Sequence, residues 1–128
     1  MEIAVAVTYH PDLDRYLLLK RSSSMSVFPQ RWNFPSGPIE DQQPKNAACR
    51  ELTKETGLDG TVKKRAAPFG LDESSYTFTI YPFLIHVQDA TVTLNVEHDQ
   101  YRWVKDRKIK TFDTVPALWT DLERLDLV

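Results

Sequence analysis

Cysteine is scarce in this chain, since Cys49 is the only one among 128 residues. A disulfide within the chain is therefore excluded, which fits the reducing conditions of the cytoplasm. No apolar run reaches the roughly 18 residues that a membrane-spanning helix requires, and no signal peptide is evident. An excess of positive charge is also missing, because the formal net charge is −2. We therefore expect a cytoplasmic protein that binds neither membranes nor nucleic acids.

The composition is that of a folded protein. Apolar residues make up 41% of the chain and charged residues 27%, a balance typical of globular proteins. The sequence contains no internal repeat, low-complexity tract or linker. A length of 128 residues is enough to bury a sizeable core. We expect a single domain over residues 1–128.

Apolar and β-branched stretches predict several strands. The most strand-like stretch, residues 76–87, contains Pro82, which cannot donate a ladder hydrogen bond and so marks an edge, a bulge or a bend. Residues 71–75 are expected to form a turn. Periodicity leaves open whether the first two strands form a hairpin. The segments expected to be extended are residues 3–8, 16–20, 61–65, 66–70, 76–87 and 91–96.

Two segments carry helix signals. Pro44 suits the first position of a helix, and Gly57 suits the left-handed residue just after its end. A second helix is expected near the C-terminus, capped by Asp113 or Thr114 with Pro116 in its first turn. Its apolar residues fall at helical spacing and are interpreted as core. They are Val115, Leu118, Trp119, Leu122 and Leu125.

The first helix also carries Glu51 and Glu55, which lie four residues apart and so project from the same side. Two carboxylates at this spacing, preceded by a loop with a glycine, can hold a hard cation against a phosphate. The alternative is ordinary charge on a solvated helix face.

The surrounding pattern resembles the Nudix box, whose family form is G-x5-E-x7-R-E-U-x-E-E-x-G-U, with U a bulky aliphatic residue. The segment Trp32-x-Phe34-Pro35 before it is also usual in that family. The residues that match the box are Gly37, Arg50, Glu51, Leu52, Glu55, Gly57 and Leu58.

The box departs from the family form in four places. Gln43 stands where the first Glu is expected, and only residues 44–49 separate it from Arg50, one fewer than in the family. Lys54 stands where the helix normally has another Glu. Ser36 replaces the first Gly of a common Gly-Gly pair, which would be a strained position if its φ were positive.

The resemblance implies an α/β fold, the Nudix α/β/α sandwich with a mixed, mostly antiparallel sheet. It also implies hydrolysis of the pyrophosphate in a nucleoside diphosphate derivative with Mg²⁺ or Mn²⁺. Glu51 and Glu55 would be metal ligands together with the Ser36 carbonyl, and Glu51 could also be the general base. Arg50, Gly37 and Gly57 would have structural roles.

Three further residues are candidates for the site. Residues 97–104 resemble the family segment E-H-x-x-x-x-W-V, so Glu97 could be a third metal ligand or a solvated loop residue. Arg21 could contact a substrate phosphate or lie in solvent at a strand end. Lys54 could weaken metal binding, bind a substrate phosphate or point into water.

Two functions therefore remain open from the sequence. One is a metal-dependent pyrophosphohydrolase of a nucleotide-type small molecule. The other is a catalytically impaired Nudix-fold module that binds a nucleotide or a protein. A monomer and a homodimer are both compatible with the sequence.

Overall fold

One mixed sheet holds the eight strands that the computed structural model shows in the residues it describes, 1–73 and 75–128. The strands are β1 (Glu2–His10), β2 (Arg15–Arg21), β3 (Trp32–Asn33), β4 (Ser36–Pro38), β5 (Gly60–Arg65), β6 (Phe69–Glu73), β7 (Tyr76–Val87) and β8 (His98–Val104). The main order is β3-β2-β1-β7-β5, with β4 paired to β1, β6 to β7 and β8 to β2. β1 and β7 are parallel, and the other pairings are antiparallel. The predicted mixed, mostly antiparallel sheet is confirmed.

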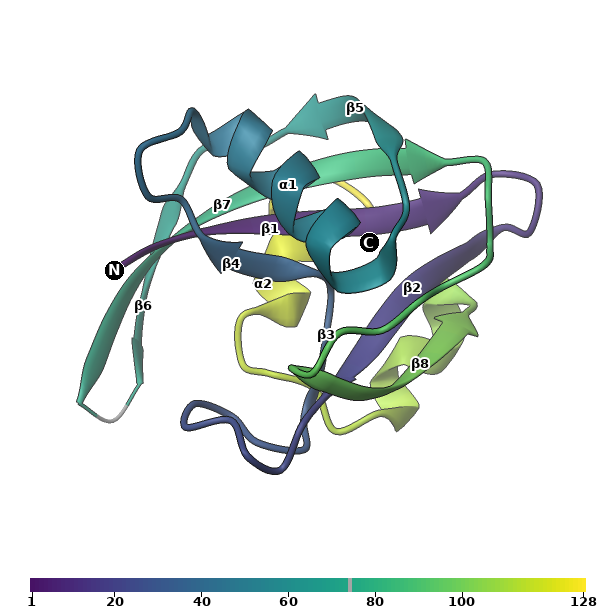
Figure 1. Cartoon of the computed structure of the whole chain (residues 1–128). Coiled ribbons are helices and arrows are strands. Elements are labelled where there is room, and N and C mark those ends of the chain that lie inside the picture. Colours follow the sequence, from purple (N-terminus) through teal and green to yellow (C-terminus); the bar gives the residue numbers. More distant parts are fainter. Residues whose placement is uncertain (74) are drawn as a thin grey trace.

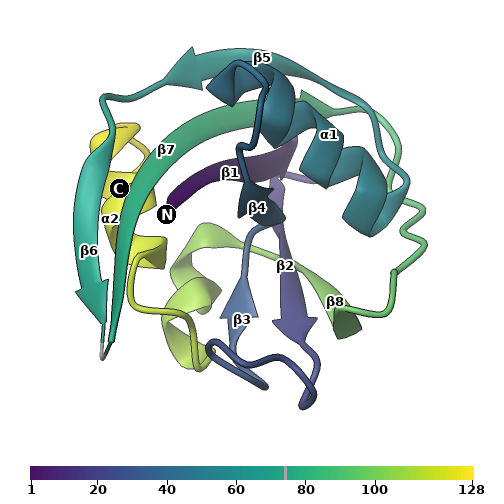
Figure 2. The same cartoon turned by 60° about the vertical axis from the view of Figure 1, so that its left-hand side comes forward.

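Helices cover both faces of this sheet. They are α1 (Pro44–Thr56) and α2 (Leu118–Arg124), which lie on opposite sides of the curved sheet, with a 3₁₀ helix η1 (Asp106–Thr111) between β8 and α2 (Figures 1 and 2). Within the described residues, no helix is long and apolar enough to cross a membrane. The three layers match the expected α/β/α sandwich.

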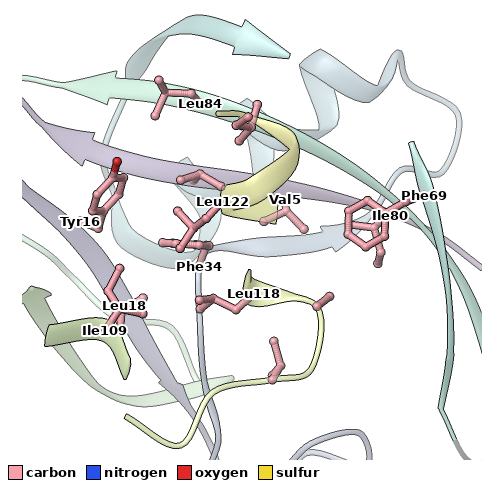
Figure 3. Packing of buried hydrophobic residues seen from close by; sticks show 14 of the residues in the cluster. Val5, Tyr16, Leu18, Phe34, Phe69, Ile80, Leu84, Ile109, Leu118 and Leu122 are labelled. Atoms are coloured by element: carbon pink, nitrogen blue, oxygen red, sulfur yellow. The ribbon is translucent and has the colours of Figure 1, made fainter. Parts of the chain in front are cut away.

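Alternation along β1 explains why both faces are apolar. Ala4 and Ala6 face α1, whereas Val5 and Val7 face α2, because neighbouring residues of a strand point to opposite faces. The small alanine side chains allow α1 to approach the sheet closely. The wider space on the other face is filled by larger side chains, among them Phe34 of the β3–β4 connection and Leu118 and Leu122 of α2 (Figure 3).

The first two predicted strands do form a hairpin, but only near the turn. β1 and β2 pair at Tyr9↔Tyr16 and His10↔Arg15. Further along, the edge of β1 is taken by β4, with Ala4 opposite Gly37. This change of partner places β4 directly beside α1, which is where the conserved-looking motif lies on the fold.

Pro82 lies where β7 changes its neighbour. β6 pairs with the first half of β7 and β5 with the second half, so the ladder on that side is already interrupted at Pro82. The predicted turn at residues 71–75 is wrong in its first part, because β6 extends to Glu73. Ser74, within the same predicted turn, lies outside the described residues.

The strand predicted at residues 91–96 is wrong. Thr93 donates its N–H to the Thr56 carbonyl of α1 at 2.9 Å, and Val92 and Leu94 pack against the core on that side. Their alternation therefore reflects packing on α1 rather than pairing in the sheet. The edge of β2 is taken instead by β8, a strand that the sequence analysis did not identify.

The last helix begins later than predicted. Trp32 donates its N–H to the Asp113 carbonyl at 2.9 Å, and Val115 donates to the Trp32 carbonyl at 3.0 Å. These bonds hold the residues before Pro116 in an extended bridge, so neither Asp113 nor Thr114 caps the helix. Its N-cap is Ala117. The predicted apolar stripe is confirmed as core, with Leu118, Leu122 and Leu125 buried.

Candidate functional site

Helix α1 has the ends that its sequence predicts. Pro44 is in the first turn, where its missing N–H breaks no hydrogen bond. Gly57 adopts φ 76° and donates its N–H to the Thr53 carbonyl at 2.8 Å. A left-handed residue at this position ends the helix and favours glycine. The helix is therefore held at both ends with its carboxylate face against β4.

Glu51 and Glu55 are not solvated surface charges. Their exposed fractions are 2% and 0%, so the interpretation as a functional pair gains over that of an ordinary helix face. Gly37 makes room for them, because a Cβ added there would overlap the Glu51 carboxylate. This close approach is a physical reason for glycine at position 37, where φ is not positive.

The two carboxylates have different partners. Glu51 accepts a hydrogen bond from Arg50 Nε at 3.0 Å through Oε2, and its Oε1 lies 3.6 Å from Lys54 Nζ. Glu55 accepts the Ser36 N–H at 3.2 Å through Oε1. Burial, followed by the nearby Glu51 charge, raises the pKa of Glu55 well above its usual range. A second positive charge beside this pair would therefore be favoured.

Arg50 has a partner that the sequence spacing did not suggest. Its guanidinium donates to Gln42 Oε1 and to the Pro38 carbonyl, besides the bond to Glu51. Gln43, placed by spacing at the first Glu of the box, is instead the N-cap residue of α1. Residues 43–49 lie between Gln42 and Arg50, which restores the family spacing of seven. The loop is therefore shortened before Gln42, and Arg50 fastens it to α1.

Lys54 joins Glu97 to this cluster. Its ammonium lies 3.4 Å from Glu97 Oε1, and Asn95 Nδ2 also donates to that oxygen at 3.2 Å. The Glu97 side chain is 31% exposed and that of Lys54 is 52% exposed. Although partial burial opposes it, the Glu51 and Glu97 charges raise the pKa of Lys54. Lys54 thus points at the carboxylates rather than into open water.

His98, the residue after Glu97, touches the same pair without charge. Its Nε2 lies 3.8 Å from Glu55 Oε1. Burial, followed by the charge of Arg21, lowers the pKa of His98 to about 4. The ring is therefore neutral at neutral pH, and this contact is not an ion pair.

Arg21 and Ser36 lie at the edge of a cavity beside the carboxylates. Arg21 donates from Nε to the Val27 carbonyl at 2.9 Å, and both residues line the cavity together with Glu97. Ser36 is in strand β4 and is not among the residues with positive φ. The condition for strain at Ser36 is therefore not met.

The donor chemistry fits a hard divalent cation. Oxygen atoms are the ligands that Mg²⁺ prefers, and Glu55 Oε2 has no hydrogen-bond partner within residues 1–73 and 75–128. The same part of the chain contains no ready group of three or more acidic, histidine or cysteine side chains around one point. Lys54, lying between Glu51 and Glu97, accounts for the separation of the third carboxylate. Glu51, Glu55 and Glu97 could hold the ion together once Lys54 turns aside.

The sequence analysis missed two residues of the cavity, Asn33 and Asp121. Asp121 is 1% exposed. A signal for it was present, because Asp121 falls on the apolar stripe of α2 between Leu118 and Leu125. A carboxyl at a core position of a helix is unusual. Asn33 has no comparable signal in the sequence.

Comparison with known proteins gives a consistent result. Residues 2–121 match the pattern of the NUDIX domain. The nucleoside triphosphatase NudI of Klebsiella pneumoniae (strain 342) is 28% identical over 127 residues, covering 88% of this chain and 89% of that protein. The CTP pyrophosphohydrolase of Escherichia coli (strain K12) is 26% identical over 119 residues, covering 91% and 84%. The crystal structure of a MutT protein from Methanosarcina mazei Go1 superposes with a TM-score of 0.81 at 25% identity, covering 98% and 92%.

Proposed function

Because this chain belongs to the Nudix family and is a pyrophosphohydrolase of that family, we propose that it cleaves the pyrophosphate of a nucleoside diphosphate derivative with Mg²⁺ or Mn²⁺. Nudix hydrolases in general use divalent metal ions. The observation that supports the proposal is the buried pair Glu51 and Glu55 on α1, held against β4 at Gly37. Such a pair attracts a cation strongly, since burial opposes an uncompensated charge.

The difficulty of the reaction is negative charge on the phosphates. A divalent cation bound here would neutralise that charge and lower the pKa of a bound water. Water attacks one phosphorus, the bridging P–O bond breaks, and the leaving phosphate takes the electron pair. Glu51 is our candidate to accept the proton of the attacking water, or to hold the cation, because Arg50 orients its carboxylate.

The neighbouring residues would position the substrate. Glu97 is the proposed third carboxylate, the Ser36 carbonyl a proposed backbone ligand, and Arg21 a proposed phosphate contact at the cavity edge. When Lys54 releases Glu51 and Glu97, its ammonium becomes available to a substrate phosphate. In this proposal one lysine keeps the carboxylates apart before binding and contributes a positive charge afterwards.

A substrate panel tests the function. The panel contains the common nucleoside triphosphates, ADP-ribose, dinucleoside polyphosphates and coenzyme A, each with Mg²⁺, with Mn²⁺ or with EDTA. We expect metal-dependent release of a nucleoside phosphate from at least one of them. Equal turnover in EDTA would contradict the role of the metal, and no turnover on any compound would contradict the hydrolase.

A second function is favoured by one contact, the Lys54 bridge between Glu51 and Glu97. If the lysine keeps its place, the site is an anion-binding site without catalysis. The chain would then bind a nucleotide without cleaving it. Calorimetric binding of a panel compound that is never turned over would support this alternative over the hydrolase.

A further inference from the structure

Buried oxygens without partners are concentrated at one place in this fold. Among the described residues, four buried side-chain oxygens have no hydrogen-bond partner, namely Asn33 Oδ1, Glu55 Oε2 and both carboxyl oxygens of Asp121. Glu55 belongs to the carboxylate pair, and the other two residues line the adjoining cavity. Folded proteins keep few such atoms, because an unpaired buried oxygen destabilises the native state. Their shared location indicates that a ligand pairs with them.

The cavity has the size and the walls for a flat ring. Its volume is about 200 Å³, below the roughly 300–1,000 Å³ of pockets for drug-sized ligands. Val5, Phe78 and Ile80 line it from the sheet, and Val115 and Ala117 line it from the segment before α2. Figure 3 shows Val5 and Ile80 on the sheet face that α2 covers. Apolar walls with a few polar groups suit a heterocycle better than a phosphate or a cation.

The polar groups of the cavity can read the edge of such a ring. Burial raises the pKa of Asp121 well above its usual range. The side chain therefore offers one O–H donor and one carbonyl acceptor at neutral pH. Asn33 uses its Nδ2 to donate to Ser36 Oγ at 3.3 Å, which leaves its carbonyl oxygen directed to the cavity as an acceptor. Nucleobases carry donors and acceptors side by side on their edges.

We propose that this cavity is the base-binding subsite and that Asp121 recognises the hydrogen-bonding edge of the nucleobase. Glu97, Ser36 and Gly37 line the same cavity, so a base held by Asp121 leaves its phosphates directed to the carboxylates of α1. The inference rests on the proposed function for the identity of the ligand. Binding of the base itself does not require turnover.

Equilibrium binding of nucleoside monophosphates tests the subsite without hydrolysis. AMP, GMP, CMP and UMP are titrated by calorimetry, with ribose 5-phosphate as the probe that lacks a base. We expect wild-type protein to bind at least one monophosphate on the order of tenfold more tightly than ribose 5-phosphate. Asp121→Leu is expected to bind that monophosphate and ribose 5-phosphate alike. Asp121→Asn, which keeps a donor and an acceptor, should retain the preference within a few-fold.

Stability measurements separate recognition from structure. Asp121→Leu removes a group that has no partner in the described residues, so we expect its Tm to be unchanged or higher. Glu123→Gln, an exposed change on the same helix, should alter neither binding nor Tm. If Asp121→Leu fails to fold, methyl NMR of wild-type protein decides. Signals of Val5 and Ile80 should shift with the monophosphate and not with ribose 5-phosphate.

Two results would overturn the inference. One is wild-type protein that shows no preference for any monophosphate over ribose 5-phosphate, by calorimetry or by methyl shifts. The other is a folded Asp121→Leu that keeps the full preference. Failure of the hydrolase proposal is recognised separately, because it appears as absent turnover while the monophosphate still binds.

Discussion

The two helices both present carboxyl groups to the ligand side of the sheet, but in opposite surroundings. On α1, Glu51 contacts Arg50 and Lys54, and Glu55 accepts the Ser36 N–H. On α2, Asp121 is as deeply buried, and its oxygens have no partner in residues 1–73 and 75–128. One group is surrounded by cations and amide donors, whereas the other lies in an apolar wall.

This difference suggests two kinds of recognition from one residue type. Carboxylates among cations and donors keep a polar, ion-binding site that can exchange Lys54 for a metal ion and phosphate. A carboxyl without charged partners takes up a proton and becomes a neutral hydrogen-bonding group. The proposed division is that α1 acts on the phosphates and α2 on the base. The predictions below test each side of it.

Removing the charge of Glu51 should have the largest effect. Glu51→Gln keeps the shape of the side chain but can neither accept the proton of water nor attract a cation equally well. We expect kcat to fall on the order of a thousandfold, measured with Mg²⁺ on the best compound of the panel. Glu123→Gln, the same change at an exposed position, should leave kcat unaltered. Unchanged turnover in Glu51→Gln would refute the role given to α1.

Gly37→Ala should disturb the same carboxylate without touching its charge. The added methyl would overlap the Glu51 carboxylate, so the side chain must move. A displacement of about 1 Å can lower turnover a hundredfold, and we expect a loss of 10- to 100-fold. Gly70→Ala is the matched control, because nothing lies within 4 Å of a Cβ there. Equal kinetics in the two variants would show that Gly37 does not make room for the site.

Lys54→Met should strengthen metal binding. The substitution removes the ammonium 3.6 Å from Glu51 and 3.4 Å from Glu97, leaving both carboxylates available to a cation. Because Lys54 is about half exposed, solvent weakens its effect, and we expect Mn²⁺ affinity to rise on the order of tenfold by calorimetry. Lys45→Met, at an exposed position of α1, should not change it. Weaker Mn²⁺ binding in Lys54→Met would indicate that the lysine supports the metal.

Local signals predicted the elements that depend on neighbouring residues. Pro44 and Gly57 located α1, and the apolar run at Tyr76–Val87 located β7. Residues 91–96 failed because alternation cannot distinguish pairing in a sheet from packing on a helix. The start of α2 failed because its predicted capping residues are held by Trp32, far away in the sequence.

The site divides in the same way. Glu51 and Glu55 follow from helical spacing, and their association with Gly37 is confirmed by the fold. Gln42 as the partner of Arg50 did not follow, because a shortened loop shifts the register by one residue. Asp121 was counted among no candidates, since its meaning depends on the cavity that β1, β7 and α2 form together.

The smallest expected effect concerns the α2 side and is a dependence of stability on pH. Burial raises the pKa of Asp121 in the folded protein, while in the unfolded chain it stays near about 3.9. Above that pH the unfolded chain releases a proton that the native state retains, so this residue lowers stability as pH rises. Asp121→Asn lacks the effect.

The free energy of unfolding of Asp121→Asn minus that of the wild type should therefore grow from about pH 4 upward. The slope cannot exceed about 1.4 kcal/mol per pH unit, and it ends at the pKa of the folded state. Urea unfolding of both proteins between pH 4 and 8 measures it, and the subtraction cancels titrations elsewhere in the chain. A difference that stays constant would mean that Asp121 is ionised in the folded protein. Asp121 would then resemble the carboxylates of α1, and the contrast between the two helices would be lost.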